Sequence, residues 1–125
     1  MITEIEDLKV LDKPPVTKVT LKFVTSYIYN QNKFITDNHL TNQSFEVLVL
    51  LVTNYHYTGG GMSVNQVLKH HSFSHGYYKK IYSMMTTLYN NGMIEYIGNG
   101  WNNCKLFAPT DKAISSIISL VSSIT

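Results

Sequence analysis

The sequence predicts a mainly α-helical fold with a small β-hairpin, and three features of its second half carry that prediction. Apolar side chains recur at helical spacing over His75–Asn90, which indicates one amphipathic helix. Gly92 follows at the position where a left-handed residue commonly ends a helix. Asn99-Gly100 separates the strand-like runs Met93–Ile97 and Trp101–Ala108, and favours a two-residue type I′ turn. A shorter helix signal lies upstream, so the order is that of a winged helix-turn-helix.

The composition is that of a single folded domain spanning residues 1–125. Hydrophobic residues make up 44% of the 125 residues and charged residues 14%, which is enough apolar material for one core. The acidic amino terminus lacks the basic and apolar halves of a signal peptide, and no apolar run approaches the roughly 18 residues of a membrane span. Cys104 is the only cysteine, so an intrachain disulfide is excluded. We therefore expect a cytoplasmic protein that does not enter a membrane.

Positive charge gathers in one part of the chain. The formal net charge is only +2, and the sequence contains no arginine. Residues 1–61 hold six acids and five lysines, a sum of −1, whereas residues 62–110 hold four lysines and one acid, a sum of +3. The excess therefore falls on the predicted helix-turn-helix and hairpin, which favours an anionic partner there.

The amino-terminal part is expected to hold an arm and one long helix. Residues 1–15 are polar and end at Pro14-Pro15, which indicates an arm or a short lead-in. Apolar residues at near-helical spacing predict a first helix over residues 16–36. The β-branched run Val16–Val24 also fits an alternating strand, and Asp37-Asn38-His39 ends either element.

The winged helix-turn-helix core is expected over residues 41–110. Thr41 is suited to cap a helix whose run Phe45–Val52 is apolar on more than one face, as in a central buried helix. Ser63 and Gln66 form the capping-box pattern of a short helix that follows. The expected buried stripe of the longer helix after it consists of Ile81, Met84, Met85 and Leu88.

Residues 111–125 are predicted to form a last helix with an apolar stripe and a serine face. The first and last helices carry more apolar surface than a winged helix needs to cover, so we expect them to form a homodimer interface. The candidate interface residues are Phe23, Tyr27, Ile114, Ile117, Ile118 and Val121. The alternative is that these two helices simply close the core of a monomer.

The polar face of the longer helix and the hairpin provide the candidate DNA contacts. Lysine neutralises phosphates, hydroxyl and amide groups bond to phosphates or base edges, and a helix start offers amides to an anionic oxygen. The candidate residues are Ser74, His75, Tyr78, Lys79, Lys80, Tyr82, Ser83, Trp101, Asn102, Asn103 and Lys105. The alternatives are a merely solvated helix face and a Trp101 that packs across the hairpin onto Ile97 or the helix.

Three segments resemble the MarR family of bacterial regulators. His39–Leu51 is similar to the family's "gLTxxqxxvLxxL" opening, Leu88–Glu95 to its "L…GlI" join of recognition helix and wing, and Phe107–Ile114 to its close of the wing. The resemblance covers roughly residues 17–123, and the length and order also look like the small single-domain SarA relatives. It implies a winged helix-turn-helix, DNA binding, regulation of transcription, and terminal helices that pack across a two-fold axis.

The hairpin departs from the pattern of that family. The family's wing usually carries an Asp-x-Arg pair whose arginine enters the minor groove, whereas the hairpin Gly98–Lys105 has neither Asp nor Arg. Lysine, tyrosine and asparagine must therefore do any reading of DNA, which predicts modest, salt-sensitive affinity.

Other chemistry is weakly indicated. His71 and His75 are four residues apart, but a predicted turn separates them and no acid or cysteine completes a metal site. Cys104 fits a small core residue better than a redox sensor. No nucleotide-binding, hydrolase or paired-carboxylate motif is present, so we expect no enzyme, no metal and no cofactor. Tyr55–Tyr57 are candidates to line an effector pocket, although the sequence names no ligand.

Two functional hypotheses follow from these observations. The first is a homodimeric transcriptional regulator that binds double-stranded DNA, based on the element order, the +3 segment and the three family-like motifs. The second is a winged helix that serves as a protein-interaction module in a regulatory, replication or mobile-element assembly without strong DNA binding. The absence of arginine motivates the second hypothesis.

Overall fold

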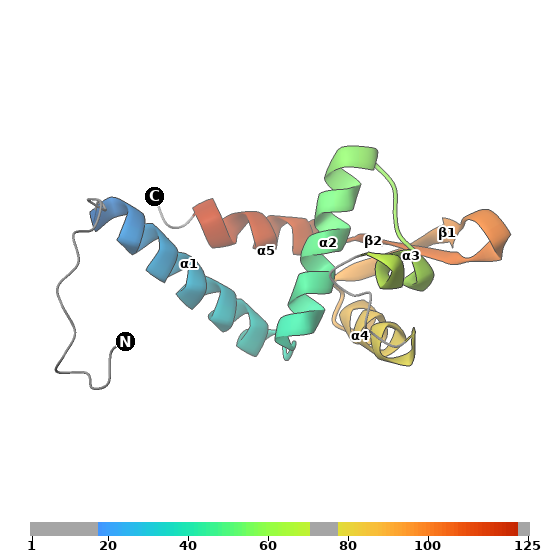
Figure 1. Cartoon of the computed structure of the whole chain (residues 1–125), viewed down its shortest axis with the longest axis horizontal. Coiled ribbons are helices and arrows are strands. Elements are labelled where there is room, and N and C mark those ends of the chain that lie inside the picture. The colour runs from blue at the N-terminus through green and yellow to red at the C-terminus, as the bar shows by residue number, and fades with distance from the viewer. Residues whose placement is uncertain (1–17, 71–77, 123–125) are drawn as a thin grey trace, which may run out of the picture.

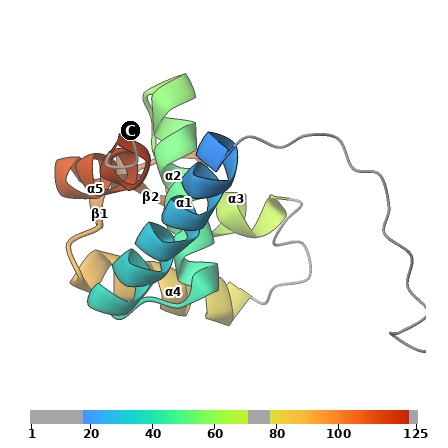
Figure 2. The same cartoon turned by 90° about the vertical axis from the view of Figure 1, so that its left-hand side faces the viewer.

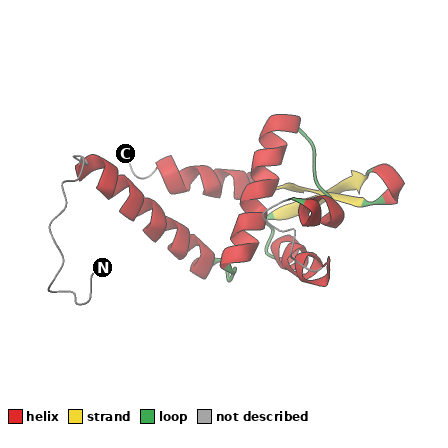
Figure 3. Ribbon diagram, viewed as in Figure 1, coloured by secondary structure: helices red, strands yellow, loops and turns green. Residues whose placement is uncertain are grey.

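The computed structural model of the chain describes residues 18–70 and 78–122 (Figure 1). In these ranges the chain is mainly α-helical with one two-stranded antiparallel hairpin, as the sequence predicts (Figure 3). Helix α2 stands in the middle, with α3, α4 and the hairpin on one side and α1 and α5 extending from the other (Figures 1 and 2). The elements are α1 (Lys18–Asp37), α2 (Asn42–Thr58), α3 (Val64–Lys69), α4 (Tyr78–Asn90), β1 (Ile94–Asn99), the 3₁₀ turn η3 (Trp101–Asn103), β2 (Lys105–Pro109) and α5 (Asp111–Ser122).

The predicted first helix is confirmed as α1, and the alternative of a strand is wrong for the part of that run that the structure describes. The predicted arm, residues 1–15, lies outside the described residues. Helix α1 ends at Asp37, and His39 takes a left-handed φ of 56°. The amide of Leu40 then donates to the carbonyl of Ile35 at 2.9 Å, which satisfies a carbonyl in the last turn of the helix. None of the described helices is long and apolar enough to cross a membrane.

Helix α2 is the centre of the core, as predicted. Thr41 caps it by accepting a hydrogen bond from the amide of Ser44 at 3.1 Å, and Gly59 ends it with a φ of 70°. Apolar side chains of α2, α3, α4 and β1 pack together around it. The most deeply buried of these are Val47, Leu48, Leu51, Val67, Ile81, Leu88, Met93 and Ile94.

The predicted boundaries of the helix-turn-helix are also confirmed where the structure describes them. Ser63 and Gln66 exchange both hydrogen bonds of a capping box at the start of α3, at 2.8 and 3.2 Å. Gly92 closes α4 with a φ of 73°, and the amide of Met93 donates to the carbonyl of Leu88 at 2.9 Å. The predicted cap Ser74 lies outside the described residues.

The predicted two-residue turn at Asn99-Gly100 is wrong. Strand β1 continues to Asn99, which pairs with Lys105 across the hairpin. The left-handed pair that a type I′ turn needs is Asn102 and Asn103, each with a φ of 58°, and the return strand begins only at Lys105. Asparagine tolerates the left-handed region, so either site satisfies the local requirement for a turn. The register shift between Tyr96 and Gly98, a β-bulge, accompanies the longer arrangement.

Thr110 joins the end of the helix-turn-helix to the last helix. Its hydroxyl donates to the carbonyl of Gly92 at 2.8 Å and accepts from the amide of Ala113 at 3.2 Å. The same side chain therefore closes the exit from α4 and caps α5. The predicted last helix is confirmed up to Ser122, and residues 123–125 lie outside the described residues.

Candidate nucleic-acid interface

Helix α4 has one buried and one exposed face. The predicted stripe of Ile81, Met84, Met85 and Leu88 is buried against α2 and α3. The candidate contacts Tyr78, Lys79, Lys80, Tyr82 and Ser83 are all exposed. Two other candidates, Ser74 and His75, lie outside the described residues. The exposed face thus combines two cations in its first turn with hydroxyl-bearing side chains along its length.

Two tyrosines on this face stack on each other along the helix. The rings of Tyr78 and Tyr82 lie one turn apart, with centroids 6.2 Å apart and planes 26° from parallel. The hydroxyl of Thr86 continues the row and donates to the carbonyl of Tyr82 at 2.8 Å. Because this bond uses the hydroxyl hydrogen inside the helix, the Thr86 side chain offers a ligand only two groups, the hydroxyl oxygen as an acceptor and the methyl group.

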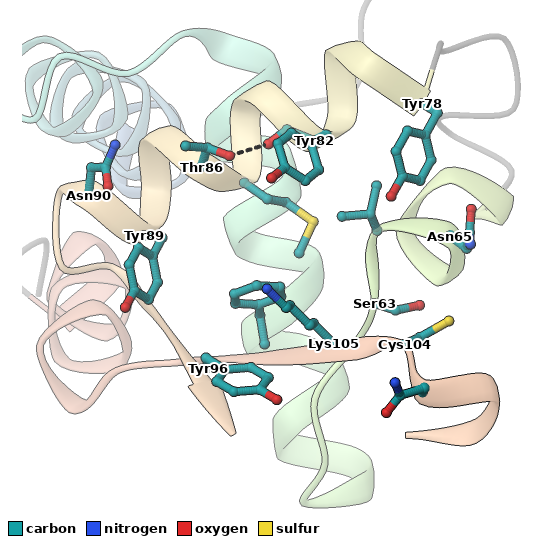
Figure 4. Close-up of a pocket in the computed structure, with 14 residues that line it drawn as sticks. Ser63, Asn65, Tyr78, Tyr82, Thr86, Tyr89, Asn90, Tyr96, Cys104 and Lys105 are labelled. Carbon is teal, nitrogen blue, oxygen red and sulfur yellow. Dashed lines mark hydrogen bonds between the residues drawn. The ribbon is translucent and has the colours of Figure 1, made fainter. Parts of the chain in front are cut away.

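A cleft of about 680 Å³ separates this face of α4 from the hairpin (Figure 4). The side chains of Tyr82 and Thr86 border it from α4, and those of Tyr96 and Lys105 border it from the hairpin. Asn65 at the start of α3 closes one end. The candidate residues Tyr78, Tyr82, Asn103 and Lys105 therefore lie around one hollow, although they come from separate elements.

Sequence reasoning missed Tyr89 and Tyr96 as residues of this cleft. Tyr89 is seven positions, or about two helical turns, after Tyr82 on α4. Helical periodicity therefore places the two tyrosines on the same face of the helix and could have predicted Tyr89. Tyr96 lies on β1 opposite Phe107 of β2, and nothing in its local sequence indicates that the strand faces α4.

The tip of the hairpin is held by side-chain amides. The Tyr96 hydroxyl donates to Oδ1 of Asn99, and Nδ2 of Asn99 donates to Oδ1 of Asn103 at 2.7 Å. Trp101 stands at this tip with 87% of its surface exposed. The alternative that Trp101 packs across the hairpin onto Ile97 or the helix is therefore wrong.

The two terminal helices expose much apolar surface. Nδ2 of Asn30 on α1 donates to the carbonyl of Leu120 on α5 at 3.1 Å, which fixes the two helices to each other. Ala113 and Leu120 of α5 are buried within the chain. The exposed apolar residues of the two helices are Leu21, Phe23, Val24, Ile28, Tyr29, Ile118 and Val121. Of the other candidates for the interface, Tyr27, Ile114 and Ile117 are half-buried. Closing the monomer core does not account for the exposed members.

Several solved structures superpose on this chain. MepR, described as a transcription regulator of the Staphylococcus aureus multidrug efflux pump MepA, superposes with a TM-score of 0.60 at 13% identity over 87% of this chain and 76% of that one. MarR from E. coli gives 0.56 at 11% identity over 90% and 78%, and disulfide-formed AbfR gives 0.56 at 15% over 86% and 68%. The fold is that of the MarR-type winged helix. No protein-family model and no curated protein sequence matches the chain.

The MarR-type fold gives each part of the interface its structural name. Helices α3 and α4 form the helix-turn-helix, and the β1–β2 hairpin is the wing. The wing of this chain carries Trp101, Asn102 and Asn103 at its tip and Lys105 at its side. Four exposed lysines belong to this part of the fold, namely Lys69, Lys79, Lys80 and Lys105.

A second cleft lies between α2 and the last helix, α5. It measures about 630 Å³ and separates the end of α2 from the start of α5. Tyr55 and Tyr57 line it together with Ile114 and Ile118, so the tyrosine-rich stretch singled out in the sequence does border a cavity. Within the described residues, no three histidine, cysteine, aspartate or glutamate side chains lie together as a metal site, and Cys104 is half-buried beside the first cleft.

Proposed function

We propose that this chain forms a homodimer that binds double-stranded DNA and regulates transcription. The observation that carries the proposal is the surface around the first cleft, where the exposed face of α4 and the wing border one hollow. Lys79, Lys80 and Lys105 are exposed on these two elements. The MarR-type fold supports the proposal, since MepR is described as a transcription regulator.

In this proposal α4 enters the major groove and the wing lies on the adjoining backbone. Lys79 and Lys80, in the first turn of α4, neutralise phosphates on entry. The Thr86 hydroxyl accepts from an exocyclic amino group of adenine or cytosine, and its methyl contacts the methyl of thymine. Lysine is a compact point charge without the bidentate geometry of arginine, so affinity is modest and depends strongly on salt.

Dimerisation supplies the second half of the binding surface. The exposed apolar side chains of α1 and α5, including Ile28 at 52% and Ile118 at 57% exposure, become buried against a second copy. Each dimer then presents two α4 helices and twice the number of lysines. Two-fold symmetry makes the DNA site a pair of half-sites about one helical turn apart.

A salt titration of binding to mixed-sequence duplex DNA tests the proposal. Three lysines from each of two subunits predict that log K falls against log salt with a slope of about −4 to −6. Lys79→Ala with Lys80→Ala removes four of these charges from the dimer, so binding weakens for all sequences alike and the slope flattens by about 3 to 4. Anisotropy of an end-labelled duplex measures both quantities.

The matched control removes two lysines that lie away from the proposed DNA-binding surface. Lys33 on α1 and Lys112 on α5 are exposed, so Lys33→Ala with Lys112→Ala loses the same formal charge and keeps the slope. Absence of duplex binding even at low salt would contradict the proposed function. Equal losses in the two double variants would mean that net charge alone, and not the face of α4, attracts the DNA.

The second candidate function is a protein-interaction module. The net charge of +2 and the lack of arginine favour it, because most DNA-binding surfaces carry more charge. Under that function the same cleft receives a polypeptide, and the titration above finds no duplex binding at any salt concentration.

A further inference from the structure

The wing tip exposes the indole ring of Trp101, although the turn itself does not require an apolar side chain at this position. Trp101 is 87% exposed, more than any other large hydrophobic residue among those that the structure describes. Tryptophan is usually well buried because its large apolar surface is unfavourable in water. The core of the chain closes without Trp101, so its role in the fold does not explain its presence at this position.

The backbone that carries Trp101 is held on both sides. The amide of Gly100, just before it, donates to the carbonyl of Cys104 at 2.7 Å. Just after it, Asn102 and Asn103 adopt the left-handed pair of the turn, and Asn103 accepts from Asn99 at 2.7 Å. A rigid turn loses little conformational entropy when its tip side chain binds a partner.

The wing tip also lies on the side of the molecule that faces DNA in the proposed function. Asn103 and Lys105, two and four residues after Trp101, border the same cleft as Tyr82 and Thr86 of α4. A duplex that lies along α4 therefore passes the wing tip, with Lys105 placed to meet a phosphate.

We propose that Trp101 is a wedge that enters the minor groove and inserts its indole partly between two neighbouring base pairs. This inference rests on the proposed function. Apolar side chains inserted in this way unstack a base step and bend the duplex by roughly 20–90°. Pyrimidine–purine steps such as TA and CA/TG open most easily, so the wedge selects for deformable steps at positions where no hydrogen bond reads a base. A chain without arginine thereby gains sequence preference.

Tryptophan fluorescence tests this inference directly, because Trp101 is the only tryptophan in the sequence. In the free protein its emission is expected to match that of a hydrated indole and to be quenched readily by acrylamide. Addition of a duplex with a TA step at each outer end of the paired half-sites is expected to quench the emission by base stacking and to protect the remainder from acrylamide. End-to-end energy transfer in a doubly labelled duplex is expected to rise as the DNA bends.

Substitutions separate the wedge from the phosphate contacts. Trp101→Ala removes one wedge from each subunit of the dimer. Loss of one aromatic stack alone weakens binding by about 5- to 150-fold, so duplex binding is expected to weaken by at least that much and the bend to be abolished. The salt slope stays unchanged because the lysines remain, and Trp101→Phe keeps most of the affinity. Ile97→Ala, at an apolar side chain of β1 that is 47% exposed and does not line the cleft, is the matched control and leaves affinity and bending as they are.

Three results overturn the wedge. In the first, the protein binds duplex DNA in a salt-dependent way, but Trp101 emission does not change and the DNA does not bend. That result contradicts the wedge and agrees with the proposed function. Shielded emission in the free protein shows that a second copy, and not DNA, covers the indole. Complete absence of duplex binding at low salt removes the proposed function and the wedge together.

Discussion

The ring of Tyr89, in the last turn of α4, packs edge-on against the ring of Phe107 in β2, with centroids 6.3 Å apart and planes at 78°. Tyr96 of β1 approaches the same phenylalanine at 6.0 Å. The backbone of Phe107 also exchanges two hydrogen bonds of 2.9 Å with Met62, in the connection between α2 and α3. Helix α4, the wing and the α2–α3 connection are therefore joined at one residue, in the middle of β2.

Truncation of that ring is expected to loosen the wing. Phe107→Ala removes the packing of Tyr89 and Tyr96 and leaves a cavity, so we expect a loss of about 2–4 kcal/mol in the free energy of unfolding. Phe107→Leu keeps most of the volume and is expected to cost less than half as much. Urea titrations followed by circular dichroism measure both losses. A Phe107→Ala protein as stable as the native chain would show that these ring contacts do not hold the wing.

Close backbone approach at Gly61 gives a second prediction. A Cβ at Gly61 would lie 2.5 Å from the carbonyl oxygen of Phe107, so the α2–α3 connection would have to move away from β2. Gly61→Ala is expected to lower stability by about 1–3 kcal/mol through overpacking.

Gly60 provides the matched control for this prediction. A Cβ there meets only the hydroxyl of Thr58, at an ordinary 3.5 Å. Gly60→Ala is therefore expected to leave stability within about 0.5 kcal/mol or to raise it slightly. If Gly61→Ala proved as stable as Gly60→Ala in thermal unfolding, the strand pairing between Met62 and Phe107 would not be as tight as described.

Those features of the fold that depend on local sequence could be predicted. Thr41, Ser63 and Gln66 cap helices through bonds to residues three positions away, and Gly92 ends α4 through its own left-handed backbone. The buried stripe of α4 follows from helical periodicity alone. In each case the deciding interaction lies within one turn of the residue that signals it.

The wing turn and the cleft could not be predicted in the same way. Asn99-Gly100 and Asn102-Asn103 both tolerate positive φ, and the choice between them is a matter of strand register, with a bulge before Gly98. That register follows from contacts such as Tyr89 with Phe107, whose partners are far apart in sequence. The cleft likewise gathers residues from α3, α4 and the hairpin, which lie far apart in sequence. Helical periodicity could therefore predict only the residues that α4 contributes.

The dual role of Thr110 leads to a third prediction. Thr110→Val keeps the shape of the side chain but removes both the bond to the Gly92 carbonyl and the cap of α5. We expect a loss of about 1–2 kcal/mol, the usual effect of removing a helix cap, and Thr110→Ser is expected to restore most of it. Thermal unfolding of the three proteins at one concentration gives the comparison. A serine variant as unstable as valine would assign the effect to the methyl group and not to the hydroxyl.

The exposed stripe of α5 leads to a prediction about assembly. Ile118 is 57% exposed, so Ile118→Glu is expected to fold normally and to separate the proposed dimer. The substitution removes an apolar side chain from the interface of each subunit and adds two carboxylates that must be desolvated. The dissociation constant is therefore expected to rise by about 100-fold or more. Light scattering after size-exclusion chromatography at micromolar concentration is expected to show a dimer for the native chain and a monomer for the variant.

Ser119→Glu is the control, because Ser119 is exposed beside the stripe and not on it. A native chain that already runs as a monomer would refute the interface, and a dimeric Ile118→Glu protein would move it away from α5.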